Sequence, residues 1–218
     1  MVSRETPPLP PWLRPVQEQL GDFGGLLADV GVSRGLIGPR EVPRIWQRHL
    51  LNCAVVADPE RHVIPAGSTV ADVGSGAGLP GLVWAIVRPD LQVALIEPLL
   101  RRSTFLTEAI DQLSLQDRVS VRRDRAEDVV RDAAWSGVDV VTARAVAPLD
   151  RLIGWTVPLL RPGGRLVALK GSSAQEEVAA ATGALTRAGL SDVRVRQLAA
   201  DYLDQPTTVI TAVRRAAQ

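Results

Sequence analysis

The spacing of hydrophobic positions changes near residue 68 of this chain. Before that point, apolar residues recur at helical spacing in two segments, 16–30 and 41–57. This periodicity predicts two amphipathic helices, the second with a proline in its first turn. We expect residues 12–66 to form a helical cap and the proline-rich residues 1–11 to be a flexible tail.

From residue 68 onward, short apolar runs alternate with amphipathic segments. This alternation is typical of parallel strands joined by crossover helices. We expect strands over residues 69–73, 92–96, 119–121, 138–141 and 165–169. Helices are expected near residues 81–87, 100–113, 148–160 and 174–188.

The last two apolar runs, residues 193–198 and 207–213, have only the loop 199–206 between them. That loop is too short for the crossover helix that parallel strands need. The two runs therefore predict a terminal antiparallel hairpin. Residues 67–218 are expected to form a Rossmann-like α/β domain with a mostly parallel, seven-stranded sheet.

A glycine-rich loop follows the first expected strand. The strand contains an acidic residue, Asp72, and glycines follow at positions 74, 76, 78 and 81. Glycine permits backbone conformations that a side chain forbids, and it lets the main chain approach a ligand closely. The spacing from Gly76 to Gly81 also matches a dinucleotide fingerprint. The loop alone therefore leaves a nicotinamide cofactor and other nucleotide-like cofactors open.

Further polar residues follow the other expected strands, at the sheet edge where ligands bind. Glu97 comes about 20 residues after the glycines, where a carboxylate accepts hydrogen bonds from ribose hydroxyls. Glu127, with the backbone of Ala126, suits an adenine edge. Arg144 suits a carboxylate or a phosphate, and Lys170, the only lysine, suits a phosphate. Solvated charges or ion pairs are the alternative interpretation of these charged residues.

Composition excludes several classes of protein. The single cysteine, Cys53, cannot form an internal disulfide, and His49 and His62 are too few to indicate a metal site, so we expect no metal. His49 lies on the apolar face of its helix, which favours a buried, hydrogen-bonded histidine. No apolar run reaches the roughly 18 residues of a membrane span, and no signal peptide is recognisable, so we expect a cytoplasmic protein. A net charge of +1 gives no argument for nucleic-acid binding.

Two details separate the possible cofactors. Asp72 lies just before the first glycine, where a carboxylate would repel a pyrophosphate bound at the helix N-terminus. The ammonium and sulfonium groups of S-adenosylmethionine are compatible with that carboxylate. The terminal hairpin is also expected of the methyltransferase version of this architecture. We therefore predict the class I S-adenosylmethionine-dependent methyltransferase fold.

Several motifs of the chain resemble one family. They are residues 72–81, Arg48-His49, residues 125–127, Arg144-Ala145 and residues 169–171. Over residues 36–213 the chain resembles the bacterial small-subunit rRNA guanine-N7 methyltransferases, also called glucose-inhibited division protein B. The run Gly-Leu-Pro-Gly at the end of the glycine loop is the most specific element of this resemblance.

The resemblance implies transfer of a methyl group from S-adenosylmethionine to N7 of guanine 527 (family rRNA numbering) in 16S rRNA. It implies cofactor contacts at Gly74, Leu79, Ala126, Glu127 and Arg144. Together with the residues argued above, the expected cofactor set is Asp72, Gly74, Gly76, Gly78, Leu79, Glu97, Ala126, Glu127 and Arg144. The chain departs from the family within the cap, at residues 33–40 and at Asn52-Cys53, where Asp-Ser is common.

Guanine N7 has an in-plane lone pair and no proton, so its methylation needs no general base, and we expect no catalytic side chain of that kind. We expect Arg44, Arg48, Arg144 and Lys170 to form an RNA-facing rim. The expected partner is 16S rRNA within the small ribosomal subunit or an assembly intermediate, bound by a monomer, with neither DNA nor a membrane as partner. The alternatives are a small-molecule methyltransferase, an NAD-dependent oxidoreductase and a non-enzymatic rRNA-binding assembly factor.

Overall fold

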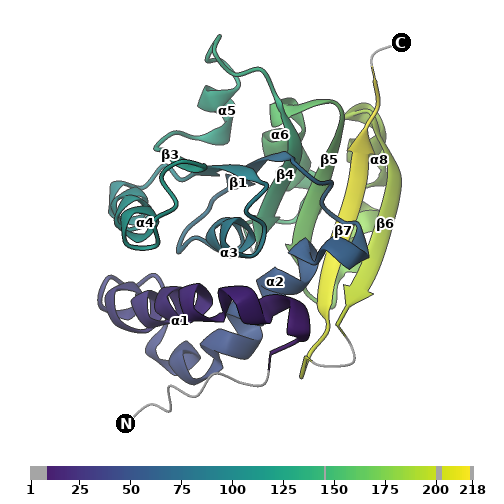
Figure 1. Ribbon diagram of the computed structural model, residues 1–218. Coiled ribbons are helices and arrows are strands. Elements are labelled where there is room, and N and C mark those ends of the chain that lie inside the picture. The colour runs from purple at the N-terminus through teal and green to yellow at the C-terminus, as the bar shows by residue number, and fades with distance from the viewer. Residues whose placement is uncertain (1–8, 145, 200–202, 217–218) are drawn as a thin grey trace.

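The computed structural model describes residues 9–144, 146–199 and 203–216. A seven-stranded sheet runs through it in the order β3-β2-β1-β4-β5-β7-β6 (Figure 1). The pairs β1–β2, β2–β3, β1–β4 and β4–β5 are parallel, which confirms the predicted α/β sheet. The strands are β1 Thr69–Val73, β2 Gln92–Ile96, β3 Val119–Arg122, β4 Val138–Arg144, β5 Leu160–Lys170, β6 Leu190–Leu198 and β7 Thr207–Arg214.

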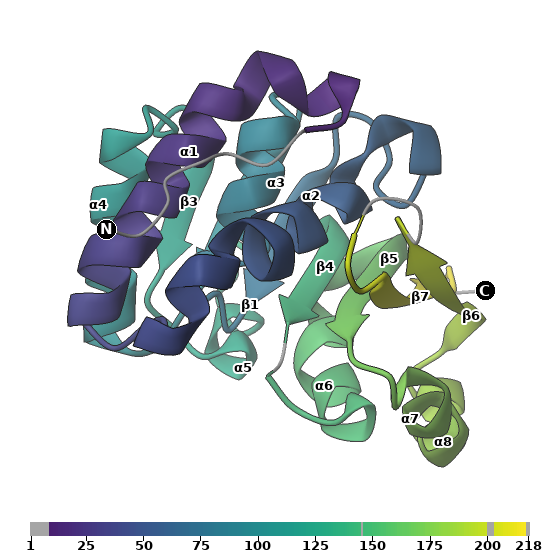
Figure 2. The ribbon, with the colours of Figure 1, turned by 90° about the horizontal axis from the view of Figure 1, so that it is seen from below.

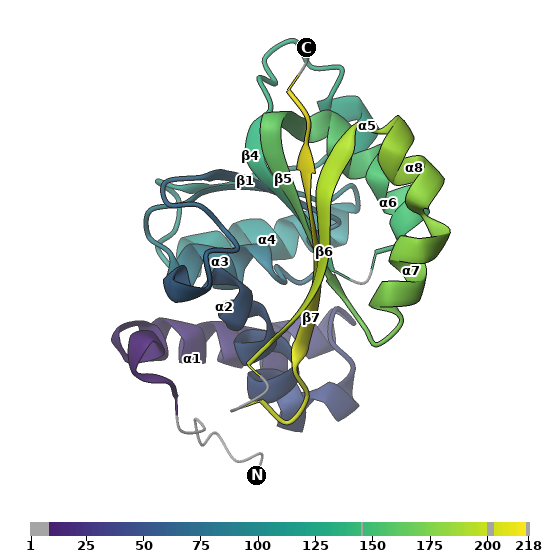
Figure 3. The same cartoon turned by 90° about the vertical axis from the view of Figure 1, so that its right-hand side faces the viewer.

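The last two strands form the predicted antiparallel hairpin. β7 pairs antiparallel with both β5 and β6 and therefore lies between them (Figure 3). Residues 200–202 of the connecting loop lie outside the described residues. So do residues 1–8 of the expected tail, whereas Leu9 is buried against the core.

Helices cover both faces of the sheet (Figures 1 and 3). The face toward the cap carries α3 Gly81–Val87 and α4 Leu100–Gln112. The opposite face carries the helices α5 Ala126–Val129, α6 Leu149–Thr156, α7 Ala174–Ala180 and α8 Thr182–Arg187. Because side chains alternate along a strand, Val93 and Leu95 of β2 join the core on the cap side, and Ile96 joins the core on the other side.

The cap consists of two helical segments, as the hydrophobic spacing predicts. The first comprises η1 Pro11–Val16, α1 Gln17–Leu26 and η2 Leu27–Gly31, and the second comprises η3 Pro39–Arg44, η4 Ile45–Leu51 and α2 Asn52–Ala57. A short turn, η5 Pro59–Arg61, leads on to β1. Residues 53–57 of α2 are buried, and α2 contacts both α3 and β7. Cap residues and sheet residues therefore share one hydrophobic core.

Several element boundaries differ from the prediction. β4 continues to Arg144, and β5 begins at Leu160, inside the region expected to be helical. α6 ends at Thr156 and a 3-10 turn, η6 Val157–Leu159, follows it, because Pro158 has no N–H to continue α-helical bonding. The helix expected over 174–188 is divided into α7 and α8. Within the described ranges, no helix is both long and apolar enough to cross a bilayer.

Candidate active site

The carboxyl ends of the parallel strands meet at one edge of the sheet. α3 and α4, which follow β1 and β2, cover one face, whereas α6, which follows β4, covers the other. β1 and β4 are neighbours, so the connections change sides between them. Ligands of open α/β sheets bind in the crevice at such a point. Asp72 of β1 and Arg144 of β4 lie at these strand ends, and Glu97 directly follows β2.

The glycine loop connects β1 to α3. Gly74, Gly76 and Gly78 have φ angles of 70°, 56° and 86°. A Cβ added to Gly78 would lie 2.4 Å from Leu82 Cδ1, so the packing around the loop requires glycine there. A Cβ added to Gly76 would meet nothing closer than the Gly74 carbonyl oxygen, at 3.7 Å. Gly76 is thus the position where the bare backbone is open to a ligand.

Asp72 is buried beside the start of α3. Its Oδ2 accepts a hydrogen bond from the Gly81 N–H at 3.0 Å. Its Oδ1 is buried and finds no hydrogen-bond partner among the described residues. Desolvation disfavours the charged carboxylate and raises the pKa of Asp72 to about 7. A buried carboxyl oxygen without a donor fits a ligand that brings an ammonium group, directly or through water.

The carboxylate of Glu97 supports the glycine loop. Its Oε2 accepts a hydrogen bond from the Gly76 N–H at 3.0 Å, and its Oε1 accepts one from the Leu99 N–H at 3.0 Å. The side chain is 2% exposed. Since each carboxylate oxygen has a second lone pair, the expected ribose contact remains compatible with these bonds and stays a prediction.

Arg144, the last residue of β4, is bonded to the cap. Its Nη2 donates to the Arg48 carbonyl oxygen at 3.0 Å and to His49 Nδ1 at 2.8 Å. Its Nη1 donates to Cys53 Sγ at 3.2 Å. His49 is therefore partly buried and hydrogen-bonded, as its place on the helix predicts. In Figure 2 the cap faces the viewer, and β1, β4 and β5 lie farther back.

Lys170 is paired within the protein. Its Nζ lies 2.6 Å from Glu177 Oε2 and donates to the Ala147 carbonyl oxygen at 2.7 Å. The Glu177 Oε2 also accepts from the Leu149 N–H at 2.9 Å. With its side chain only 8% exposed, Lys170 is placed to hold the segment after β4 rather than to project from a rim. An RNA contact of Lys170 stays a prediction, and the two contacts that its ammonium group makes within the protein argue against it.

The other predicted site residues differ in exposure. Ala126 is buried at the start of α5, Glu127 is exposed and Leu79 is half-buried. Arg44 is exposed on the cap, and the side chain of Arg48 is 50% exposed, 3.3 Å from the Glu41 carboxylate. The ligand contacts expected of these residues stay predictions.

Sequence reasoning missed several residues at this edge. Exposed arginines follow β2 and β3, namely Arg101, Arg102, Arg123 and Arg125. Exposed large apolar side chains follow β2 and β4, namely Leu99, Leu100 and Val146. Their positions just after predicted strands were a usable signal. The edge thus offers both cations for a phosphate backbone and apolar surface for a base.

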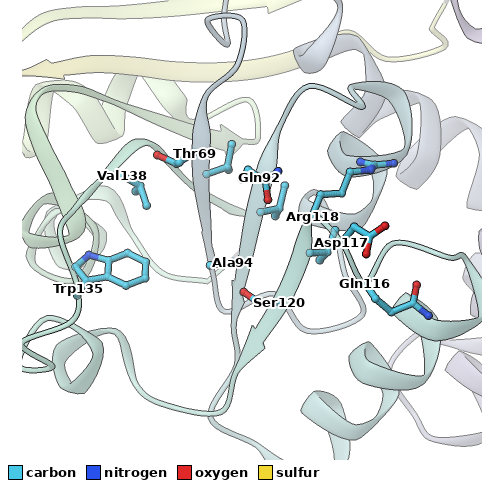
Figure 4. A pocket seen from close by; sticks show the side chains of 12 residues that line it. Thr69, Gln92, Ala94, Gln116, Asp117, Arg118, Ser120, Trp135 and Val138 are labelled. Carbon is cyan, nitrogen blue, oxygen red and sulfur yellow. The ribbon is translucent and has the colours of Figure 1, made fainter.

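A hollow at the other end of the sheet is separate from this site. Its volume is about 250 Å³, and it lies beside the amino ends of β1, β2 and β3 (Figure 4). Trp135 and Val138 line one side of it, and Gln116 and Asp117 lie on the other. None of the predicted site residues lines this hollow.

The residues at the carboxyl edge fit S-adenosylmethionine. Gly76 leaves room for close approach of a ligand, and Asp72 Oδ1 lacks a donor that an ammonium group can supply. These features do not require a metal, and within the described ranges no group of three or more His, Cys, Asp or Glu side chains is placed to hold one.

Comparison with known proteins agrees with this geometry. The sequence profile of the family rRNA small subunit methyltransferase G matches residues 16–205. A protein of that name from Salinispora tropica is 58% identical over 197 residues, covering 88% of this chain and 79% of the relative. Its counterpart from Streptomyces coelicolor is 52% identical over 212 residues, covering 95% and 86%.

The fold has solved neighbours as well. A crystal structure of an S-adenosylmethionine-dependent O-methyltransferase from Thermotoga maritima superposes with a TM-score of 0.58 at 16% identity, covering 82% of this chain and 71% of that one. The predicted methyltransferase fold is thereby confirmed. With the family profile matching most of its length, the chain belongs to the rRNA small subunit methyltransferase G family.

Proposed function

We propose that this protein transfers the methyl group of S-adenosylmethionine to N7 of a guanine in the rRNA of the small ribosomal subunit. The observation that carries the proposal is the combination, at one sheet edge, of an open glycine loop with cations and exposed apolar side chains. A cofactor of nucleotide size accounts for the open glycine loop, and an RNA acceptor accounts for the arginines near that loop. The site accordingly operates in the cytoplasm, where small subunits are assembled.

The residues of this site act by positioning. When bound, S-adenosylmethionine supplies an electrophilic methyl group on a sulfonium leaving group. Guanine N7 presents a lone pair and no proton, so the protein need not supply a base. Holding the two reactants aligned lowers such a barrier by about 7–11 kcal/mol at most. We assign the cofactor side to the glycine loop, Asp72 and Glu97, and the RNA side to Arg44, Arg48 and the arginines that follow β2 and β3.

The direct test is methyl transfer to isolated subunits. Small subunits from cells lacking this methyltransferase are incubated with the protein and methyl-labelled cofactor, and N7-modified guanines are mapped by strand scission. We expect one labelled guanine, poor labelling of a short naked RNA hairpin, and at least about tenfold slower transfer by Arg144→Ala. Arg187→Ala, which removes an exposed arginine of α8, is the matched control and should transfer at the normal rate.

The alternatives give different results in the same experiment. Label appearing only in small molecules indicates a small-molecule methyltransferase. Binding of a nicotinamide dinucleotide in place of S-adenosylmethionine indicates an oxidoreductase. Tight subunit binding without any transfer indicates a non-enzymatic assembly factor.

A further inference from the structure

A chain of hydrogen bonds joins the cap to the last residue of β4. Glu41 Oε2 lies 3.1 Å from His49 Nε2, and His49 Nδ1 lies 2.8 Å from Arg144 Nη2. The three residues come from η3, η4 and β4, which are far apart in the sequence. The His49 side chain between them is 12% exposed.

The donor inventory fixes the roles of both ring nitrogens. An arginine side chain only donates hydrogen bonds, so His49 Nδ1 must accept from Arg144 with its lone pair. The proton of the neutral ring then sits on Nε2 and is donated to the Glu41 carboxylate. Glu41 therefore selects the tautomer in which Nδ1 is free to accept.

The electrostatic surroundings agree with a neutral ring. Burial lowers the pKa of His49 to about 4, and the neighbouring positive charge of Arg144 acts in the same direction. Glu41 opposes this shift, and Arg48 adds to it more weakly. At neutral pH the imidazole is uncharged and offers the acceptor that the guanidinium requires.

The Arg144 guanidinium keeps N–H donors that make no hydrogen bond within the described residues. Of its five N–H donors, one bonds Cys53, one the Arg48 carbonyl and one His49. The Nε–H and the second Nη1–H have no acceptor within the described residues. Two residues along the chain, Val146 packs on the glycine loop, because a Cβ on Gly74 would lie 3.0 Å from its Cγ2.

We propose that His49 and Glu41 are positioning residues that fix the orientation of the Arg144 guanidinium, so that its two remaining donors stay available to a ligand in the crevice. This inference rests on the proposed function. Because the resemblance implies a cofactor contact for Arg144, the positioning should appear first in the affinity for S-adenosylmethionine. The cap, which is expected to face the RNA, thereby also sets the geometry of the cofactor side.

The test uses graded substitutions of His49 in the whole protein. His49→Leu removes the acceptor, whereas His49→Asn keeps an acceptor oxygen near the place of Nδ1. We expect His49→Leu to raise the Kd for S-adenosylmethionine, measured calorimetrically, by about tenfold, and His49→Asn to restore most of that loss. Glu41→Gln, which still accepts from Nε2–H, should have a smaller effect. His62→Asn replaces the other, exposed histidine and should bind like the wild type.

A double-mutant cycle separates positioning from a general structural role. If His49 acts through Arg144, then His49→Leu adds no further loss of affinity to Arg144→Met. An equal loss in both backgrounds would overturn the proposal, and so would unchanged affinity of His49→Leu. Thermal unfolding of each variant checks that it is folded, and if the leucine variant is not, His49→Gln replaces it in the cycle, because the longer glutamine side chain carries its amide beyond the place of Nδ1. Failure of the wild type itself to bind S-adenosylmethionine would instead contradict the proposed function.

Discussion

At the scale of single residues, Asp72 is a carboxyl side chain that is removed from water. It is fully buried, one oxygen accepts only the Gly81 N–H, and the other has no partner within the described residues. Such an arrangement is unfavourable for folding and is typical of a site reserved for a ligand. The burial of Asp72 therefore lowers the stability of the fold and leaves one carboxyl oxygen available to a ligand.

We predict that Asp72→Asn stabilises the protein at high pH while weakening cofactor binding. In the folded protein the pKa of Asp72 is raised from 3.8 to about 7. Between these values the unfolded chain has lost a proton that the folded chain keeps, so wild-type stability falls as pH rises through about 7. The asparagine cannot titrate. Its stability relative to the wild type should grow by about 4 kcal/mol between acid and alkaline pH, as one pKa unit corresponds to about 1.4 kcal/mol.

Urea unfolding of both proteins at pH 5 and pH 8 measures the part of this change that falls above pH 5, about 3 kcal/mol, because about two of the pH units over which Asp72 loses stability lie there. Asp90→Asn is the control of opposite sign, because hydrogen bonds from Arg88 lower the pKa of Asp90 to about 2. The stability that Asp90 contributes is present above its ordinary pKa and is lost only as pH falls toward 2. Its substitution should therefore cost the same at pH 5 and pH 8. An Asp72→Asn curve parallel to the wild type would contradict the assignment.

Glycines of the same loop separate into two kinds. A Cβ on Gly81 would lie 2.4 Å from Leu95 Cδ2 and 2.7 Å from Asp72 Oδ2, whereas a Cβ on Gly76 would meet only the Gly74 carbonyl oxygen. We predict that Gly81→Ala destabilises the fold by about 1–3 kcal/mol through overpacking. Gly76→Ala should cost only about 1–2 kcal/mol for its left-handed backbone but should abolish most cofactor binding.

Thermal unfolding and calorimetric titration of each glycine variant give the two readouts. Gly25→Ala in α1 is the matched control, since a Cβ there meets nothing within 4 Å. It should leave cofactor binding unchanged and raise stability by roughly 0.5–1 kcal/mol through helix propensity. Normal cofactor affinity in Gly76→Ala would show that the ligand does not approach this part of the loop.

At the scale of elements, the segment between β4 and α6 is anchored from two directions. Arg144 fastens its start to the cap, and Lys170 with Glu177 fastens its end through the Ala147 carbonyl and the Leu149 N–H. Ala145 lies outside the described residues. The segment therefore joins the cap, the glycine loop and the end of β5.

We predict that Lys170→Met loosens this segment. The substitution leaves the Glu177 carboxylate without its cation, which should cost about 1–3 kcal/mol, and the double variant Lys170→Met, Glu177→Leu should regain part of it. Hydrogen exchange at the Leu149 N–H should accelerate in Lys170→Met.

If Lys170 binds a phosphate instead, the salt dependence of subunit binding should lose about one unit of slope in Lys170→Met. An unchanged slope with faster exchange supports the anchoring role.

At the scale of the whole molecule, the cap and the sheet form one body. α2 occupies a position on the sheet face beside α3, and its residues 53–57 are buried. Removing the cap would expose the faces of α3 and β7 that it covers. The expected division at residue 66 is thus a change in the type of secondary structure, and the hydrophobic core continues across it.

The sequence predicted most of the architecture because periodicity is a local property. β1 and β2 have the bounds that their apolar runs indicate, and the short loop after β6 dictates the antiparallel hairpin. The end of α6 and the division of α7 from α8 were not predicted. The end of α6 has a local signal that hydrophobic spacing does not include, because Pro158 has no N–H to continue α-helical bonding.

By itself, the sequence determined the fold class, the glycine loop and the family, since each follows from residues that are close along the chain. Only the tertiary structure decided how Arg144 and Lys170 are used. Both are cations at the end of a strand, and sequence reasoning placed both on an RNA-facing rim, with a cofactor contact for Arg144 as well. The fold brings His49 to one of them and Glu177 to the other. Contacts between segments so distant in the chain are fixed by packing of the whole core, and no local pattern reveals them.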